Sequence, residues 1–581
     1  MTNKPSIHIN KTETTMKKNI IATGLLVAAV AIANISMACT NFLFTKGTTK
    51  DGSTMITYAA DSHTLYGELY YRRAADYPEG TMFMLYDWDS GRQLFEIPQV
   101  AHTYNVVGNM NEYQLAIGET TFGGREECWE GTGIDYGSLI YVTLQRAKNA
   151  REAIKTMTEL VANYGYCSEG ESFSICDPNE VWILELIGKG KEEKGAVWVA
   201  RRIPDGYVSG HANQARITTF PLEAKNVKKD HKSISAKNMK YIFEADVECV
   251  YANDIITFAR NKGWFAGKDA EFSFTDTYAP LTFSGIRGCD ARVYAMFHRV
   301  NPAEMEQYED YAMGWNKANR MPLWIKPDHQ VSVQEVMNLM RDHYEGTKMD
   351  MTQDVGAGPF KCPYRWRPMG FEVDGKKYVH ERATSTQQTG FSFVAQCRGW
   401  LPNKIGGILW FGVDDTYSTC YCPMYCGITE IPECFRQGNG DMLTYSETAA
   451  FWLFNRVTNF CYSRYSDMIV DLQKVQFSLE SEFVSAVDRN DMRCSKLSDP
   501  LLVERLNEFS LQQADHMMAK WRELDHFLLV KYIDGNVKKE TNGKFERTET
   551  GMAAFPNQPK YPDWFYKMIV ADHGKIVIEK K

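Results

Sequence analysis

Three features are scarce or missing in this sequence. After residue 38, no stretch is long and apolar enough to span a bilayer, which takes about 20 consecutive apolar residues. Positive charge is not in excess: the formal net charge is −8 at pH 7, which argues against general nucleic-acid binding, because that needs a basic surface. We find no convincing internal repeat or low-complexity linker. A hydrophobic content of 44% then indicates a globular protein with a substantial core.

A zinc-binding arrangement of the cysteines is also missing. Fourteen cysteines are present, and four of them cluster at positions 420, 422, 426 and 434. Their spacing is not that of a C-x-x-C pair and no histidine lies nearby, so buried thiols or disulfides are expected there instead of zinc. With Cys39 set aside, an odd number remains, so complete internal pairing is impossible. We expect no metal and no other cofactor.

The first 38 residues have the organisation of a secretory leader. Lys17 and Lys18 precede an uncharged apolar stretch at 20–33, and Ser36 and Ala38 are the small residues that signal peptidase needs at its cleavage site. The apolar stretch is short for a transmembrane span. We therefore predict that residues 1–38 are removed and that the protein is exported to the periplasm or the exterior. An uncleaved N-terminal anchor is the alternative.

Cleavage after Ala38 would make Cys39 the new N-terminus, with a thiol and a free α-amine on one residue. A thiol has a pKa of about 8.5 and an α-amine one of about 7.7–8.0, so the amine is partly neutral near pH 7 and can accept the thiol proton. One residue would then supply both nucleophile and base. A cysteine directly after a leader can instead carry a lipid, which would block both groups; that signal favours leucine where this chain has Ser36.

The pattern of elements predicts a layered α+β domain with antiparallel sheets. Residues 39–61 and 105–119 are typical of strand pairs, the second turning at 111–112. A helix is expected at 137–147, and Asn149 can cap the next one with Glu152 as its capping-box partner. Further strands and helices follow. The strands are expected at 172–176, 180–187, 196–201 and, at the end of a polar tail, 575–578, and the helices at 446–457, 466–487 and 500–530.

Several residues could complete a site around Cys39. Asp61 closes the strand pair that begins at Cys39, so it can orient the new ammonium, and Asn213 follows a strand and can supply an amide to a developing oxyanion. Glu119 could hold a substrate ammonium. A substrate carboxylate could be held by Arg216, Arg287 or Arg292. Each of these residues also has an ordinary structural or surface role open to it.

Eight stretches, in order along the chain, resemble the C69 dipeptidases. The first is Cys39-Thr-Asn-Phe-Leu-Phe-Thr-Lys-Gly, which is similar to the mature start of that family. The other stretches begin at Glu119, Trp182, Val197, Ala212, His343, Arg382 and Pro423. These dipeptidases are N-terminal nucleophile hydrolases related to penicillin V acylases and bile salt hydrolases. Each motif alone is weak, but the ordered set is fairly specific.

The resemblance implies an αββα sandwich that hydrolyses dipeptides with Cys39 as nucleophile. Asp61 matches the acid near the amine and Asn213 the oxyanion-hole amide. One position departs from the family: relatives often carry arginine three residues before that aspartate, where this chain has Tyr58. Thr121 aligns with an asparagine of the acylase relatives, which argues against a close copy of their site, and Arg292 matches a family arginine loosely. We take Glu119, Thr121 and Arg292 as the candidate substrate-binding residues.

We therefore predict an exported cysteine dipeptidase that uses no metal. Residues 1–38 would be the leader, 39–440 the catalytic domain, and 441–581 a largely helical extension packed on it, the last boundary being only a shift in composition near 440. One alternative is an amidase of acylated amino acids, bile salts or penicillin-like amides. Another is a lipid-anchored binding protein with a dead site. Dipeptides are the expected partners, and the helical region could assemble a homo-oligomer.

Overall fold

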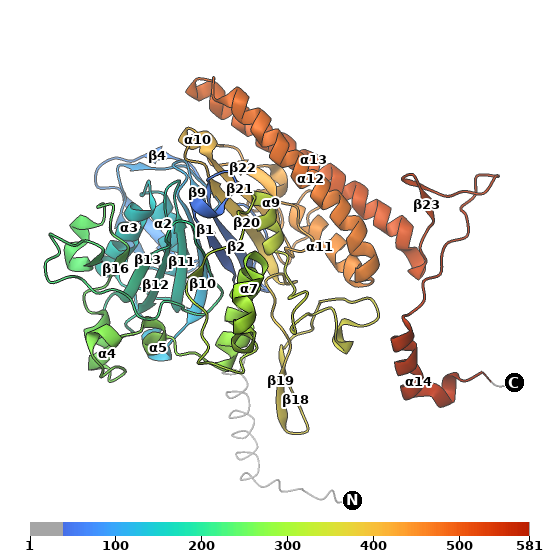
Figure 1. Cartoon of the computed structure of the whole chain (residues 1–581). Helices are drawn as coiled ribbons and strands as arrows, with labels where there is room; N and C mark the ends of the chain where they lie inside the picture. The colour runs from blue at the N-terminus through green and yellow to red at the C-terminus, as the bar shows by residue number, and fades with distance from the viewer. Residues whose placement is uncertain (1–38, 580–581) are drawn as a thin grey trace, which may run out of the picture.

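The fold starts from the two strands that carry Cys39 and Asp61. β1 (Asn41–Phe44) and β2 (Thr54–Asp61) pair antiparallel, and every residue of both strands is buried. The computed structural model describes residues 39–579 and shows an α+β fold (Figure 1). The predicted leader, with its basic residues, apolar stretch and cleavage site, lies outside the described residues. The strand pair predicted at 39–61 is confirmed.

β1 and β2 belong to a seven-stranded antiparallel sheet, in which β2 pairs with β20 along its whole length. The seven strands of this sheet, in spatial order, are β17 (Trp324–Ile325), β14 (Val208–His211), β1, β2, β20 (Thr389–Cys397), β21 (Gly407–Val413) and β22 (Cys422–Tyr425). Strands far apart in the sequence are thus neighbours, and the pairing of β2 with β20 puts Asp61 opposite Thr389.

A second, nine-stranded sheet packs against the first, and all but one of its pairings are antiparallel. Its strands in spatial order are β15 (Ser233–Ser235), β16 (Cys249–Tyr251), β13 (Ala196–Arg202), β12 (Val181–Gly188), β11 (Gly170–Cys176), β10 (Ala116–Gly123), β9 (Met110–Asn111), β8 (Val106–Val107) and β3 (Tyr71–Arg72). Buried His211 of the first sheet joins the two, because its ring nitrogens lie 2.7 Å from Thr120 Oγ1 and 2.7 Å from Ser174 Oγ.

The strands predicted at 172–176, 180–187 and 196–201 are confirmed as β11, β12 and β13. The hairpin predicted at 105–119 has one more turn than expected. β8 and β9 are joined through Gly108, whose φ of +56° suits glycine, and β9 then turns into β10 after Asn111 as predicted.

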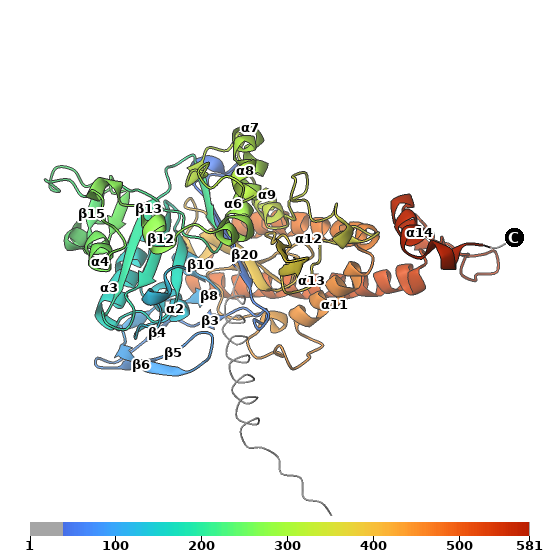
Figure 2. The same ribbon diagram turned by 90° about the horizontal axis from the view of Figure 1, so that it is seen from below.

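Helices lie against both sheets, which gives the order helices, sheet, sheet, helices (Figures 1 and 2). The nine-stranded sheet contacts α2 (Tyr136–Leu144), α3 (Ala150–Tyr164) and α4 (Ile255–Asn261). The seven-stranded sheet contacts α6 (Ala291–Val300), α9 (Val333–Leu339), α11 (Ala450–Tyr462), α12 (Tyr465–Cys494) and α13 (Asp499–Tyr532). The five helices predicted from periodicity are confirmed as α2, α3, α11, α12 and α13.

The N-terminus of α3 differs from the prediction in one bond. Asn149 Oδ1 accepts from the Glu152 backbone N–H at 2.9 Å, as a capping residue should. The Glu152 carboxylate, however, accepts from the Lys148 N–H at 2.8 Å and does not return to Asn149. The cap is therefore present without the reciprocal half of the predicted capping box.

The strand predicted at 575–578 is wrong. Residues 563–577 form α14 (Asp563–Val577), at the end of a segment that runs away from the sheets (Figures 1 and 2). A strand needs a neighbour to pair its backbone groups, whereas a helix pairs them within itself. The described tail has no partner strand at this place, so the apolar residues of 576–578 remain exposed.

The clustered cysteines at 420–434 are buried free thiols, and so is Cys39. Within residues 39–579, no group of three histidine, cysteine or acidic side chains is placed to hold a metal ion. Over the same residues, no helix has both the length and the apolarity to cross a bilayer. The division into domains at 440 stays a prediction.

A buried ion pair joins α12 to the segment after α9, and a further bond joins it to the residue that precedes β22. Glu480 on α12 accepts from Arg341 Nη2 at 2.5 Å and from the Tyr421 N–H at 2.9 Å, and both charged side chains are less than 5% exposed. Removing one partner of such a pair leaves an uncompensated buried charge, which costs about 3–5 kcal/mol.

We expect Glu480→Ala to lower the free energy of unfolding by about 3–5 kcal/mol, because Arg341 then lies buried without its counter-ion. Urea unfolding followed by tryptophan fluorescence measures this loss. Glu482→Ala, two residues away and half exposed, is the matched control and should change stability by less than about 0.5 kcal/mol. Equal effects of the two variants would show that the pair does not hold α12.

Candidate active site

Cys39 lines a cavity of about 460 Å³. The residue is only 2% exposed, at the start of the chain segment that leads into β1. Strand β2 and helix α2 supply much of the cavity wall. The lining residues are Cys39, Tyr58, Ala60, Asp61, Ser62, Thr64, Leu65, Glu68, Tyr70, Trp88, Asp89, Asn109, Tyr136, Gly137, Ile140, Tyr141 and Phe391. The volume lies within the range of about 300–1,000 Å³ that is usual for small-molecule sites.

Asp61, the last residue of β2, lies beside the thiol as the sequence predicts. Its backbone N–H bonds the Cys39 sulfur, and its carboxylate accepts from Arg382 Nη2 at 2.5 Å and from Thr389 Oγ1 at 2.6 Å. Burial raises the pKa of the Asp61 carboxyl, and the positive charge of Arg382 opposes that rise. Sequence reasoning assigned no role to Arg382, because its contact with Asp61 depends on the pairing of β2 with β20.

Tyr58, the position at which the sequence departs from the pattern expected from the resemblance, contacts both the thiol and Glu119. The Tyr58 hydroxyl lies 3.7 Å from Cys39 Sγ and donates to Glu119 Oε1 at 2.5 Å, while Glu119 Oε1 is also 3.7 Å from the sulfur. Tyr58 comes from β2 and Glu119 from β10 of the facing sheet. The three groups thus form a buried contact between the sheets, and none of the three side chains carries a positive charge.

Glu119 forms a carboxyl pair with Glu171 of β11. Two buried carboxylates so close cannot both ionise, and burial together with the charge of Glu119 raises the pKa of Glu171 well above its usual range. Burial also raises the pKa of Glu119, but hydrogen bonds to Glu171 and Tyr58 oppose that rise, so Glu171 is the member of the pair that holds a proton more readily. Thr121, a predicted substrate residue, donates to Glu171 Oε1 at 2.7 Å. Glu119 itself is fully buried and does not line the cavity.

Arg292, on α6, is fully buried and its donors are taken by protein acceptors. Its Nη1 donates to the Cys39 carbonyl at 2.6 Å and to Thr40 Oγ1 at 2.7 Å. Its Nη2 donates to Asn213 Oδ1 at 2.9 Å and to the Ala212 carbonyl at 3.2 Å. The structure thus brings Arg292, Cys39 and Asn213 together, with the guanidinium holding the backbone of the cysteine.

Asn213 lies in the loop after β14 with a φ of +58°, in the left-handed region. Its Oδ1 accepts from Arg292, and its Nδ2 donates to the Thr121 carbonyl at 2.7 Å. An amide nitrogen carries two hydrogens, so one remains for another acceptor. The two other arginines considered lie elsewhere: Arg216 donates to backbone carbonyls of residues 210, 322 and 323, and Arg287 is paired with Glu381.

The surroundings keep the Cys39 thiol protonated while residue 38 is attached. Burial raises the pKa of the thiol well above its usual range, and the negative charges of Glu119 and Asp61 raise it further. Hydrogen bonding of the sulfur with the Asp61 N–H and with the Tyr58 hydroxyl lowers the pKa of the thiol, but these two effects are smaller. A thiolate here needs additional positive charge close by.

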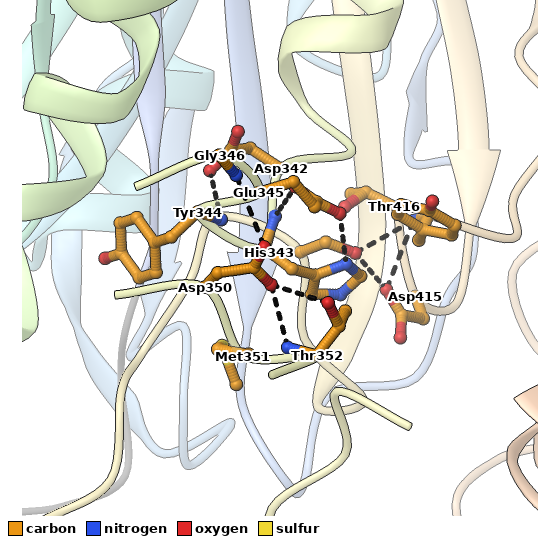
Figure 3. Close-up of polar contacts among 12 residues, drawn as sticks. Asp342, His343, Tyr344, Glu345, Gly346, Asp350, Met351, Thr352, Asp415 and Thr416 are labelled. Carbon is orange, nitrogen blue, oxygen red and sulfur yellow. Dashed lines mark hydrogen bonds and ion pairs between the residues drawn. The ribbon is translucent and has the colours of Figure 1, made fainter. Parts of the chain in front are cut away.

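A second layer of polar contacts fixes the segment that carries Arg382 and Thr389. Figure 3 draws residues 342–345 together with Asp415. The buried imidazole of His343 lies 3.4 Å from Glu345 Oε1. Tyr344 donates its hydroxyl to the Arg382 carbonyl at 2.6 Å, and Ser385 donates its N–H to the Asp342 carbonyl at 3.1 Å. These bonds hold the backbone of the segment that carries Arg382, and so help to keep its side chain paired with Asp61.

A second cavity, of about 580 Å³, adjoins the first, and Asp89 and Tyr136 line both. Thr121 and Asn213 line this second cavity. Its acidic lining residues are Asp87, Asp89, Glu130, Glu169 and Glu171. Neither cavity has a lysine or arginine among its lining residues in the described part of the chain. The surroundings of Cys39 therefore favour a positively charged ligand group.

Sequence reasoning missed three features: the bond of Tyr58 to Glu119, the pairing of Arg382 with Asp61, and the acids Glu68 and Asp89. The first two join residues that only the sheets bring together. Glu68 and Asp89 lie in irregular segments without a motif around them. The departure at Tyr58 was the one signal in the sequence that the thiol has different neighbours here.

Comparison with known proteins gives a consistent result. The model of peptidase family C69 matches residues 38–478. Probable dipeptidase B of Streptococcus pyogenes serotype M1 is 20% identical over 530 residues, which is 86% of this chain and 94% of that protein. Probable dipeptidase A of S. pyogenes serotype M3 (strain SSI-1) is 23% identical over 69% of this chain and 78% of its own. A probable dipeptidase of Salmonella dublin is 23% identical over 57% of this chain and 68% of that protein.

We expect Glu119→Gln to lower the pKa of the Cys39 thiol in the uncleaved chain, because it removes a negative charge 3.7 Å from the sulfur. Each unit of decrease makes the thiolate about tenfold more abundant below its pKa. Alkylation of Cys39, followed by peptide mass spectrometry between pH 7 and 10, should therefore be faster in the variant. An unchanged or slower rate would contradict the assignment of the charge to Glu119.

Proposed function

The chain belongs to peptidase family C69, and on that premise we propose that it is an exported dipeptidase whose nucleophile is the thiol of Cys39. The relatives are named probable dipeptidases, and an α+β fold with helices against both of its packed sheets supports the αββα N-terminal nucleophile hydrolase sandwich that we propose. In this proposal residues 1–38 are removed, residues 39–440 form the catalytic domain, and residues 441–581 pack on it as an extension. Export follows from the leader pattern, and an assembly of several chains stays open.

The reaction follows from the groups around the sulfur. The free α-amine of Cys39 takes the thiol proton, and Sγ attacks the scissile carbonyl carbon. The free N–H of Asn213 Nδ2 and a backbone N–H hold the oxyanion. As the C–N bond breaks, the ammonium returns its proton to the leaving amino group. The resulting acyl thioester is hydrolysed by a water that the same amine deprotonates, which restores the thiol.

Two of the buried groups position this machinery without touching the substrate. Arg292 holds the Cys39 carbonyl and Asn213 Oδ1, so it links the nucleophile to the oxyanion donor. Asp61, paired with Arg382, lies where its charge can orient the ammonium that forms on Cys39. Because Tyr58 brings no charge, the amine is the cation nearest to the sulfur, and activation depends on it more than in relatives with arginine at this position.

The observation that carries the proposal is the charge of the cavity. Asp61, Glu68 and Asp89 line it together with Cys39, and no lysine or arginine does so among the described residues. A dipeptide brings a free α-ammonium to the residue before the scissile bond, and carboxylates are its natural partners. We assign this ammonium to Asp89 and not to Glu119, because Glu119 is buried and bound to Tyr58. An acylated amino acid, a bile salt or a penicillin has no such ammonium.

We expect Cys39→Ala to lose dipeptide hydrolysis by a factor of at least about 10³, because the nucleophile is removed. Cys39→Ser should retain more activity than the alanine variant, since a hydroxyl can still attack. Initial rates on a dipeptide panel, with the N-terminus verified by mass spectrometry, test this. Full activity of the alanine variant would rule out the mechanism, and hydrolysis of N-acylated dipeptides alone would favour the amidase.

We expect Asn213→Gly to reduce kcat by about 10²–10³ with a smaller change in KM, because it removes an oxyanion donor. Glycine accepts the positive φ of this position, so the backbone is not strained. Steady-state kinetics on one good dipeptide measures the split. A normal kcat would show that the oxyanion is held by other donors.

A further inference from the structure

The cavity at Cys39 has one wall made of aromatic rings in mutual contact. Trp88 stacks on Tyr141 with ring centroids 4.7 Å apart, and Tyr70 meets Trp88 edge-on at 4.8 Å and Tyr141 at 5.9 Å. Phe391 of β20 extends the wall, 5.9 Å from Tyr70. All four rings line the cavity that contains the thiol. We call Tyr70, Trp88, Tyr141 and Phe391 the aromatic wall.

Two carboxylates of the same cavity have no cationic partner among the described residues. Glu68 accepts from the Gly438 N–H at 3.0 Å, and Asp89 accepts from the Tyr136 hydroxyl at 3.0 Å. Asp61, the third acid, is already paired with Arg382 at 2.5 Å. Burial raises the pKa of both Glu68 and Asp89, as expected for carboxylates that lack a counter-ion.

The cavity has two carboxylates without a cationic partner in the described part of the chain, whereas a dipeptide with uncharged side chains brings only one positive charge. Its α-ammonium can neutralise one of the two carboxylates, and we assigned it to Asp89, whose charge reaches Glu119 beside the thiol. Glu68 is then left facing the cavity next to the aromatic wall. A second positive charge on the same substrate residue would complete the pairing.

Aromatic faces also favour a cation, because their ring quadrupole is negative at the face. One ring of the wall already has a cation near it, because the guanidinium of Arg72 lies 5.7 Å from the Tyr141 ring centroid. Arg72 itself donates to the Tyr71 carbonyl at 3.0 Å and to Gln437 Oε1 at 3.3 Å, and it lines a neighbouring cavity rather than this one.

We propose that Glu68 and the aromatic wall form a specificity pocket for a lysine or arginine side chain on the N-terminal residue of the dipeptide. The apolar stem of such a side chain lies along the rings, and its charged end meets the Glu68 carboxylate. This inference rests on the proposed function, since it places the substrate against Cys39. It names the class of dipeptide that the site prefers: those that begin with a basic residue.

The test compares Lys-Ala with norleucine-Ala, which has the same stem without the charge. We expect the processed wild-type protein to have a kcat/KM at least about tenfold higher for Lys-Ala, the factor that about 1.4 kcal/mol produces. Glu68→Gln should collapse this ratio towards one. Asp89→Asn should lower both rates together, because both substrates carry the α-ammonium.

Two further variants separate the pocket from a general loss of structure. Trp88→Leu should also reduce the ratio, since it removes the stacked face of the wall. Glu79→Gln, an exposed acid outside the cavity, is the matched control and should leave the ratio unchanged. A ratio near one in the wild type, or an equal ratio in the wild type and Glu68→Gln, would overturn the proposal.

The outcomes distinguish this proposal from the proposed function. Hydrolysis of both dipeptides without a preference refutes the pocket and leaves the dipeptidase intact. If neither dipeptide is hydrolysed, the proposed function fails, and calorimetry of the two dipeptides on the Cys39→Ala protein still decides the pocket. Tighter binding of Lys-Ala than of norleucine-Ala supports it, and equal binding contradicts it.

Discussion

The proposed chemistry depends on a thiol that is buried between negative charges. Cys39 Sγ lies 3.7 Å from Glu119 Oε1, and Asp61 is close enough to act on it as well. Both charges, together with burial, keep the sulfur protonated. The bond of Arg292 to Cys39 is to its carbonyl oxygen, and Tyr58 brings no charge. The positive charge that a thiolate needs must come from elsewhere, and the α-amine of Cys39 itself is the group that processing would create there.

The fold brings these groups together through the contact between its two sheets. β2 supplies Tyr58 and Asp61, β10 supplies Glu119, and β20 places Thr389 on Asp61. The cavity next to the thiol is also negatively charged, because acidic residues line it and, among the described residues, no lysine or arginine does. A free ammonium at the substrate's N-terminus suits such a cavity, and so does a basic side chain beside it. One electrostatic feature thus connects activation, substrate class and preference.

Local patterns in the sequence were enough for much of the fold and for the closeness of Asp61 to Cys39. Alternation and turn residues predicted β11, β12 and β13, and helical periodicity predicted α2, α3 and α11–α13, because these signals are carried by neighbouring residues. The strand pair that begins at Cys39 predicted that Asp61 lies near it, whereas Asn213 was chosen from its place after a strand and from the family resemblance. The contacts of Tyr58 with Glu119 and of Arg382 with Asp61 could not be predicted, since they join segments 61 and 321 positions apart. The strand expected at 575–578 was wrong because a strand also depends on a partner that the local sequence does not reveal.

The most direct test of the account is the chemical state of the mature N-terminus in the active protein. Mass spectrometry of the intact chain and of its N-terminal peptide, on material purified by its dipeptidase activity, identifies the first residue and any group attached to it. We predict a chain that begins at Cys39 with an unmodified amine and thiol. A fully active protein that still carries residues before Cys39, or whose Cys39 amine is acylated, would contradict the central claim.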